Sequence, residues 1–487
     1  MNKLTICDNK YCKFTAQDDK TLNLLRRHLS YRQSGVEYSA AYKNGWNGIT
    51  FLMNKKGVFY SGLLENVKSF LDEQKIIYEI EDKRITTSIN KELDISEKLK
   101  KLNLIPRDYQ ERIVKACINN SKGIVRACTG SGKTLATALI TAKLNKPTII
   151  YVIGLDLLQQ FHELFSSIFD EPIGFIGNGV CKIERINIAS IWTVGKALHI
   201  NAKDLYVDED LDDEEEFNQT QEEKIVKLLE DARVHIFDES HIITCSTIQS
   251  IHKKINPEHI YGFSGTPFRD DNTDLLINGL LGEQIVDVGA SELIKRDILA
   301  QPIIKFVSVP SISMTTAPYQ KVYKEYIVEN EVRNNMIINQ VKELLDKKYT
   351  PLVLFKQIKH GQILAEKMEE AGFKFALLHG NDSLDRRNEV KTMLNNKEIN
   401  VVLASTIFDI GIDLPILNSL VLCGGGKSSI RALQRIGRVI RGYPGKKYAA
   451  VVDFYDQVKF LKKHSMARYR IYSYEPGFKV IKSKEML

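Results

Sequence analysis

The pattern that most constrains this chain is an alternation of short apolar runs with longer amphipathic stretches, which continues from residue 106 to residue 454. Strands buried on both faces of a parallel sheet read as continuous apolar runs, and the helices that connect them read as amphipathic stretches. The candidate strands form two sets: 123–127, 148–153, 186–191, 234–237 and 260–263, then 304–309, 352–355, 375–378, 401–404, 419–423 and 448–454. This pattern predicts an α/β fold with two tandem, doubly wound parallel-sheet domains.

Both ends of the chain depart from this alternation. Near the N-terminus, short alternating runs and one amphipathic stretch predict a small α+β module. Its Lys43, Trp46, Lys55, Lys56 and Tyr60 could contact DNA, or the module could be a structural cap. We expect four parts: the module at 1–95, the two α/β domains at 96–295 and 296–455, and a basic helical tail at 456–487.

Charge is unevenly distributed along the 487 residues, whose net charge is +7. The segment Asp204–Glu216 holds nine acidic residues and no basic one, and we expect a solvated insertion or a shield for a basic groove. Between Lys427 and Arg470 there are twelve basic residues and two acidic ones. A basic excess of this kind suits a polyanionic partner such as nucleic acid, but it does not identify one.

Cysteine usage and hydropathy exclude several classes of protein. The seven cysteines are scattered and form no C-x2-C pair, which argues against a disulfide framework and a structural zinc site. No apolar run approaches the ~20 residues that a membrane span needs. We therefore expect a cytoplasmic protein without a membrane partner, located in the host cytoplasm if the chain is viral.

The strongest chemical motif is the sequence ACTGSGKT at residues 127–134, which lies between a candidate strand and a helical run. Glycines let backbone N–H groups curl around phosphate oxygens at a helix N-terminus. The lysine can reach the terminal phosphates, and the threonine hydroxyl can bind Mg²⁺. The residues expected to hold the phosphates are Thr129, Gly130, Ser131, Gly132, Lys133 and Thr134, with Thr134 also a metal ligand.

A second motif, an apolar strand that ends in Asp238 and Glu239, supplies two carboxylates. An aspartate at such a strand end can bind Mg²⁺ through its oxygens. The neighbouring glutamate can orient and deprotonate an attacking water. A phosphate loop followed by this pair indicates a phosphoryl-transfer site.

The third motif lies in the other half of the chain and contains Gln434, Arg435, Arg438 and Arg441. Arginines at three-residue steps are expected to share one face of a helix. We expect Arg438 and Arg441 to stabilise the charge that develops on a triphosphate, as arginine fingers do, and we count Gln434 as catalytic. Arg435 could instead contact nucleic acid or serve a structural purpose.

In this order, the three motifs resemble those of the superfamily 2 helicases with a DExH box, over roughly residues 105–454. The resemblance implies two RecA-like domains with ATP and Mg²⁺ in the cleft between them. It also implies that Arg107 and Gln110 read the adenine, and that Gly411 and Asp413 contact the nucleotide. The nucleic-acid contacts that it implies are Gly154, Trp192, Thr193, Lys356, His379 and Thr406, and the coupling residues are His241, Ser264 and Thr266.

Within that superfamily the layout is most like the bacteriophage UvsW-type recombination DNA helicases, through residues 46–48, 57–64 and 460–468. This resemblance implies a monomeric helicase or translocase that moves 3′ to 5′ on single-stranded, duplex or branched DNA in recombination, repair or replication. The open alternatives are an RNA helicase and a strand-annealing or junction-binding factor that uses ATP without processive unwinding. The basic tail Lys459–Arg470 could contact nucleic acid or pack as a helix against the second domain.

Overall fold

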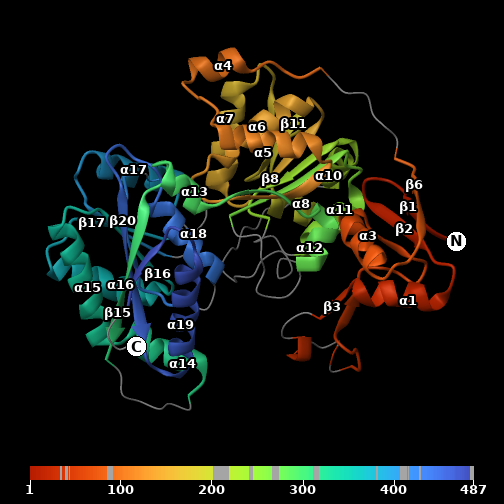
Figure 1. Ribbon diagram of the computed structural model, residues 1–487. Helices are drawn as coiled ribbons and strands as arrows, with labels where there is room; N and C mark the ends of the chain where they lie inside the picture. The colour runs from red at the N-terminus through yellow and green to blue at the C-terminus, as the bar shows by residue number, and fades with distance from the viewer. Residues whose placement is uncertain are drawn as a thin grey trace. The chain divides into compact units, whose positions relative to one another are not determined.

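The computed structural model describes residues 1–32, 36–38, 42, 44–84, 91–200, 219–240, 245–265, 274–310, 317–379, 382–405, 414, 416–426 and 429–482 (Figure 1). The chain divides into two compact units, the first made of residues 1–127 and 132–287 and the second of residues 128–131 and 288–487. In the described part of the chain, no helix is long and apolar enough to cross a membrane.

The first unit is built on an eight-stranded sheet in the order β10-β9-β11-β8-β12-β13-β7-β14. Its strands are β7 (Lys122–Ala127), β8 (Thr148–Val152), β9 (Ile173–Gly177), β10 (Val180–Lys182), β11 (Ile186–Ser190), β12 (Val234–Phe237), β13 (His259–Ser264) and β14 (Gln284–Val288). Its helices are α4 (Ser96–Lys101), α5 (Asp108–Asn119), α6 (Lys133–Leu144), α7 (Leu155–Ile168), α8 (Ile191–Ala197), α10 (Gln219–Asp231), α11 (Cys245–Lys254) and α12 (Asp274–Leu281). Parallel pairing of β12 with β8 and β13, and of β13 with β7, brings their carboxyl ends to one edge.

The N-terminal module has a four-stranded sheet of its own in the order β5-β2-β1-β6. Its elements are β1 (Asn2–Ile6), β2 (Tyr11–Thr15), α1 (Asp19–His28), β3 (Ser30–Arg32), η1 (Val36–Tyr38), β4 (Ile49–Phe51), β5 (Val58–Tyr60), η2 (Ser61–Leu63), α3 (Leu64–Glu73) and β6 (Tyr78–Asp82). On β2 alternate residues are buried, namely Cys12 and Phe14, whereas on β1 three successive residues, Leu4, Thr5 and Ile6, are buried. The alternation on β2 is the pattern of a sheet with one face on a core.

Polar contacts fix this module to the larger sheet of the first unit. The hydroxyl of Tyr60 accepts a hydrogen bond from Gln249 Nε2 (2.7 Å), and its ring meets that of His252 edge-on at 5.4 Å. Lys122 Nζ, on β7, donates to the carbonyl oxygen of Asn9 (2.5 Å). Burial lowers the pKa of Lys122 to about 8 and that of His252 to about 3. Tyr60 is therefore engaged in docking, whereas Lys43 lies outside the described residues.

The second unit is built on a seven-stranded sheet in the order β17-β18-β16-β19-β20-β15-β21, whose assigned pairs are all parallel. Its strands are β15 (Gln301–Val309), β16 (Pro351–Phe355), β17 (Phe375–Leu378), β18 (Val401–Ser405), β19 (Ser419–Leu422), β20 (Tyr448–Asp456) and β21 (Lys479–Ile481). Its helices are α13 (Ala290–Lys295), α14 (Tyr319–Tyr323), the π-helical turn η3 (Lys324–Val328), α15 (Glu331–Asp346), α16 (Ile358–Glu370), α17 (Leu384–Asn395), α18 (Ser429–Val439) and α19 (Lys459–Tyr474).

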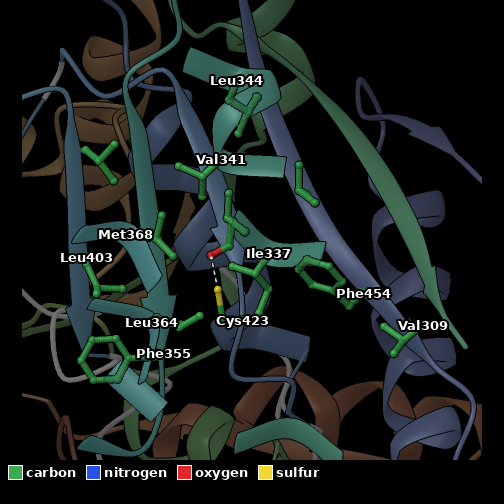
Figure 2. Close-up of a cluster of buried hydrophobic side chains, with 14 residues drawn as sticks. Val309, Ile337, Val341, Leu344, Phe355, Leu364, Met368, Leu403, Cys423 and Phe454 are labelled. Atoms are coloured by element: carbon green, nitrogen blue, oxygen red, sulfur yellow. Dashed lines mark hydrogen bonds between the residues drawn. The ribbon is translucent and has the colours of Figure 1, made fainter. Parts of the chain in front are cut away.

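Apolar side chains from α15 and α16 meet those of the central strands in the core of the second unit (Figure 2). Ile337 and Val341 of α15 and Leu364 of α16 are fully buried against residues such as Phe355 and Phe454. Strands that are apolar along their whole length are thus covered by helices, as the alternating sequence pattern predicts. The prediction of two tandem parallel-sheet domains is confirmed.

Candidate nucleotide-binding and hydrolysis site

The glycine-rich loop at residues 128–132 connects β7 to α6. Gly130 and Gly132 have φ angles of +84° and +76°, a backbone region that residues with a Cβ rarely adopt. A Cβ on Gly132 would also lie 2.4 Å from Gln110 Nε2. The loop places Lys133 and Thr134 in the first turn of α6, the end of a helix at which backbone N–H groups can bind an anion.

The two carboxylates follow β12 directly and are held by its neighbours. Asp238 N donates to the Tyr151 carbonyl (2.9 Å) on β8, and Ser240 N donates to the Phe263 carbonyl (2.9 Å) on β13. Glu239, between them, has a left-handed backbone with φ +47°, which is uncommon for a residue with a side chain. The chain turns at this residue while both flanking amides keep their hydrogen bonds to the sheet.

Lys133 brings the loop and the carboxylates together. Its Nζ lies 2.5 Å from Glu239 Oε1 and 4.0 Å from Asp238 Oδ1. The three side chains are largely enclosed, with exposed fractions of 11% for Lys133, 8% for Asp238 and 18% for Glu239. Motifs that are about a hundred residues apart in the chain therefore form one cluster of charges.

Asp238 is a buried carboxylate that lies beside the charges of Lys133 and Glu239. Burial, together with the charge of Glu239, raises the pKa of Asp238 to about 6, although Lys133 acts in the opposite direction. Its Oδ1 is buried and accepts no hydrogen bond from the described residues. Nor do those residues contain a group of three or more His, Cys, Asp or Glu side chains suited to a metal ion. One carboxylate and the hydroxyl of Thr134, in the first turn of α6, are oxygen donors of the kind that suits Mg²⁺, which usually takes its other ligands from phosphates and water.

Gln110 is buried on α5, and its amide is directed at the glycine-rich loop. Its Nε2 donates to the Gly132 carbonyl (3.2 Å), and its Oε1 accepts from the backbone N–H of Arg107 (2.9 Å). Arg107 itself is exposed and donates from NH1 to the Tyr109 hydroxyl (3.1 Å). Gln110 thus joins the start of α5 to the loop, a link that the sequence did not indicate. The reading of adenine by Arg107 and Gln110 stays a prediction.

The residues predicted to contact nucleic acid in the first unit lie after β8 and β11. Gly154, with φ +86°, separates β8 from α7. Trp192 is half-buried and Thr193 is 1% exposed, both on α8. Ser264, a predicted coupling residue, is the fully buried last residue of β13. Three of them follow the carboxyl ends of parallel strands, and Ser264 is itself such an end; the roles of all four stay predictions.

In the second unit, Gln434, Arg435 and Arg438 lie on α18. Arg441 does not, because the helix ends at Val439 and Arg441 forms an isolated β-bridge with Leu299. The prediction that the three arginines share one helical face is therefore wrong for Arg441. The three-residue spacing carried no signal for the end of the helix.

Two further predicted contacts in the second unit follow neighbouring strands. Lys356 is exposed directly after β16, and His379 follows β17 with its ring edge-on to Phe355 at 6.0 Å. The predicted residues that lie outside the described part of the chain are His241, Thr266, Thr406, Gly411 and Asp413, together with the acidic segment Asp204–Glu216.

The C-terminal helix α19 is a packing element on the side that carries Leu461, Ser465, Arg468 and Tyr472, all of them buried. Their spacing of four, three and four residues is that of one helical face. Arg468, part of the basic run considered as a nucleic-acid contact, is 4% exposed and pairs with buried Asp453. Of the two alternatives for the tail, a nucleic-acid contact or a helix packed on the second domain, this face of α19 fits the packed helix.

Comparison with known proteins finds one family model for each half of the chain. A family model for the "Type III restriction enzyme, res subunit" matches residues 103–269, which include the glycine-rich loop and the carboxylates. A second model, "Helicase conserved C-terminal domain", matches residues 335–443, which include α18 and Arg441. The chain belongs to the superfamily 2 helicases.

Several helicases are similar to this chain over most of its length. The ATP-dependent DNA helicase uvsW of Enterobacteria phage T4 is 25% identical over 508 residues, which cover 96% of each chain. "Putative helicase 22" of a Sulfolobus islandicus filamentous virus is 26% identical over 387 residues, 74% of this chain and 66% of that protein. The DNA 3′-5′ translocase XPB2 of Sulfurisphaera tokodaii is 23% identical over 374 residues, 69% of this chain and 78% of that one.

A solved helicase structure supports the fold. The structure of Saccharomyces cerevisiae Dbp5 bound to RNA and ADP BeF3 superposes with a TM-score of 0.56 at 14% identity. The match covers 80% of this chain and 94% of Dbp5. At this identity the likeness concerns the arrangement of strands and helices alone.

Proposed function

We propose that this superfamily 2 helicase is an ATP-dependent DNA helicase or translocase that remodels or unwinds branched or duplex DNA in the 3′ to 5′ direction. The observation that carries the proposal is the cluster of Lys133, Asp238 and Glu239 beside the glycine-rich loop. The similarity to a phage DNA helicase and to a 3′-5′ DNA translocase supports DNA as the partner and this polarity. The phage origin of one relative supports work in a host cytoplasm, and we further propose that the protein acts as a monomer.

Each residue of the cluster has a defined task in this proposal. Lys133 and the N-terminus of α6 bind the phosphates, while Thr134 and Asp238 hold Mg²⁺, which shields phosphate charge when bound. Glu239 accepts a proton from the attacking water. Because Glu239 Oε1 lies 2.5 Å from Lys133 Nζ, a phosphate that draws the ammonium away also releases the carboxylate for this task.

In the second unit, we assign Arg438 and Arg441 to the charge that develops on the transferring phosphoryl group, and Gln434 to the same reaction. Guanidinium groups suit this task because they stay charged and present several donors in a fixed plane. The proposed division of the chain is the one expected from sequence: the module at 1–95, domains at 96–295 and 296–455, and the tail at 456–487. The exposed Lys55 and Lys56 keep the module a candidate for DNA contact.

The decisive experiment measures the ATPase rate of the full chain with single-stranded, duplex, forked and four-way DNA, and with RNA of matched sequence. We expect DNA to stimulate the rate more than RNA does, and branched DNA to stimulate it most. A larger effect of RNA would favour an RNA helicase. Strand displacement from substrates with a 3′ or a 5′ overhang tests the polarity.

A Lys133→Ala variant separates a motor from a factor that only binds or anneals strands. We expect it to lose ATP hydrolysis and strand displacement together, because the lysine is the cation that the phosphates need. If this variant still unwinds DNA, the motor proposal is wrong. If the unmodified protein anneals strands but displaces none, the alternative of a junction-binding or annealing factor is correct.

A further inference from the structure

The loop at residues 423–426 of the second unit directly follows β19 and precedes α18, the helix that begins at Ser429 and carries Arg438. Residues 427 and 428, between the loop and the helix, lie outside the described residues. Three of its four carbonyl oxygens accept hydrogen bonds from side chains of three different helices. Tyr323 OH donates to Gly424 (2.5 Å), Arg333 NH1 to Cys423 (2.8 Å), and Arg468 NH1 to Gly426 (2.8 Å). Such a density of side-chain contacts on one short loop is unusual, because connecting segments normally lie on the surface and are mobile.

Both arginines are held in turn by buried carboxylates at the end of β20. Arg468 donates to the two oxygens of Asp453, at 2.8 Å each. Arg333 donates to Asp456 at 2.8 and 3.4 Å. All four side chains are at most 5% exposed. Burying a charged pair to this degree carries a large desolvation cost, so such pairs add little to the stability of the fold. What they do provide is a fixed geometry, because a guanidinium bonded to both oxygens of a carboxylate is held in one orientation.

The path of the backbone at residues 423–426 favours the glycines that the loop contains. A Cβ on Gly424 would lie 3.1 Å from the backbone nitrogen of Lys356, closer than ordinary contact. Gly425 has φ +54°, in the left-handed region. Glycines here let the backbone run close to β16 and expose its carbonyls to the three donors.

We infer that Tyr323, Arg333 and Arg468 are positioning residues that set the start of α18 and so the placement of its arginine, Arg438. The inference rests on the proposed function, in which Arg438 acts in ATP hydrolysis. A guanidinium that stabilises a transition state must be held close to its productive position, since misplacement by about 1 Å can cost about a hundredfold in rate. The three donors act on the loop and touch neither nucleotide nor nucleic acid in this proposal.

The chain offers a matched pair of variants. Tyr323→Phe removes the hydroxyl that bonds the loop. Tyr261→Phe removes a buried hydroxyl of the first unit, which donates to the backbone carbonyls of Cys117 (2.5 Å) and Asn120 (2.8 Å). Both changes delete one buried oxygen that bonds a backbone carbonyl, so a general loss of stability would affect both.

The experiment measures DNA-stimulated ATP hydrolysis and the affinity for a fluorescent ATP analogue in both variants. For Tyr323→Phe we expect kcat to fall by about threefold to tenfold, the effect of one hydrogen bond, with KM and nucleotide affinity unchanged. For Tyr261→Phe we expect kcat within about twofold of the unmodified protein. Equal kcat values for the two variants, with thermal midpoints that match, would overturn the inference.

A double-mutant cycle tests whether the effect passes through Arg438. In an Arg438→Lys background, which keeps a charge but loses the planar fork, Tyr323→Phe should lower kcat much less than it does alone. Additive losses would show that Tyr323 acts elsewhere and would also overturn the inference. Failure of the proposed function looks different: the unmodified protein would then hydrolyse no ATP, or Lys133→Ala would hydrolyse it normally.

Discussion

Lys133 Nζ and Glu239 Oε1 lie 2.5 Å apart, which joins the phosphate loop to the carboxylate that we assign as the general base. This ion pair is enclosed. Lys133, at the start of α6, and Glu239 follow strands β7 and β12, which are two positions apart in the sheet. The ion pair gives Lys133 and Glu239 a charged partner each and keeps both side chains within reach of one bound phosphate.

Glu239→Gln should bind ATP normally and lose at least about a hundredfold in kcat, because the amide cannot accept a proton from water. Nucleotide binding by fluorescence and steady-state hydrolysis measure the two effects separately. Glu258→Gln is the matched control, since Glu258 is paired with another lysine of the same unit, Lys146. Normal turnover in Glu239→Gln would contradict the assignment.

Gln110→Ala should raise the KM for ATP by about threefold to tenfold, through loss of the hydrogen bond to the Gly132 carbonyl. If the amide acts on the loop, hydrolysis of ATP and of GTP should weaken by the same factor. A loss confined to ATP would instead support the adenine-reading role. Parallel kinetics with the two nucleotides decide between these outcomes.

The raised pKa of Asp238, about 6, predicts a competition between protons and Mg²⁺. Metal binding needs the ionised carboxylate, so below about pH 6 the apparent Mg²⁺ affinity should fall up to tenfold for each pH unit. ATPase activity at pH 5.5 should therefore recover when Mg²⁺ is increased. An Asp238→Asn variant should lose this pH-dependent response, and a fixed Mg²⁺ requirement across the range would count against the assignment.

Lys122 predicts a pH-dependent stability of the first unit. Its folded-state pKa is lowered from 10.5 to about 8, so the unfolded chain binds more protons between these values. Stability from this group should therefore rise with pH from about 8 to 10.5. Lys122→Met should flatten that rise in thermal unfolding, whereas Lys115→Met, which removes an exposed lysine of α5, should preserve it. Equal slopes in the two variants would contradict the prediction.

Much of the framework followed from the sequence because its signals are local. The apolar run at residues 234–237 and the glycines at 130 and 132 specify a strand and a loop without reference to anything distant. Strands β9 (IGFIG) and β14 (QIVDV) are not predicted from the sequence, because two glycines interrupt the apolar run of β9 and polar residues interrupt that of β14. Their pairing depends on the neighbours that the fold supplies.

Contacts between distant residues account for most of what the sequence could not show. The link from Gln110 to Gly132 and the pairing of Arg468 with Asp453 depend on how elements pack. One clue was present: Asp453 is a charge inside the apolar run of β20, and a buried charge needs a partner. The end of α18 also had a sign in the sequence, because Gly442 and Pro444 are residues that often follow the last turn of a helix.

The pairing of Arg468 with Asp453 also fixes an order of events during synthesis. The ribosome synthesises Asp453 first, and its partner Arg468 follows fifteen residues later. The buried ion pair on β20 can therefore form only after Arg468 has left the exit tunnel. For the same reason, we expect a chain cut before residue 468 to leave Asp453 without its guanidinium partner and to destabilise the second unit.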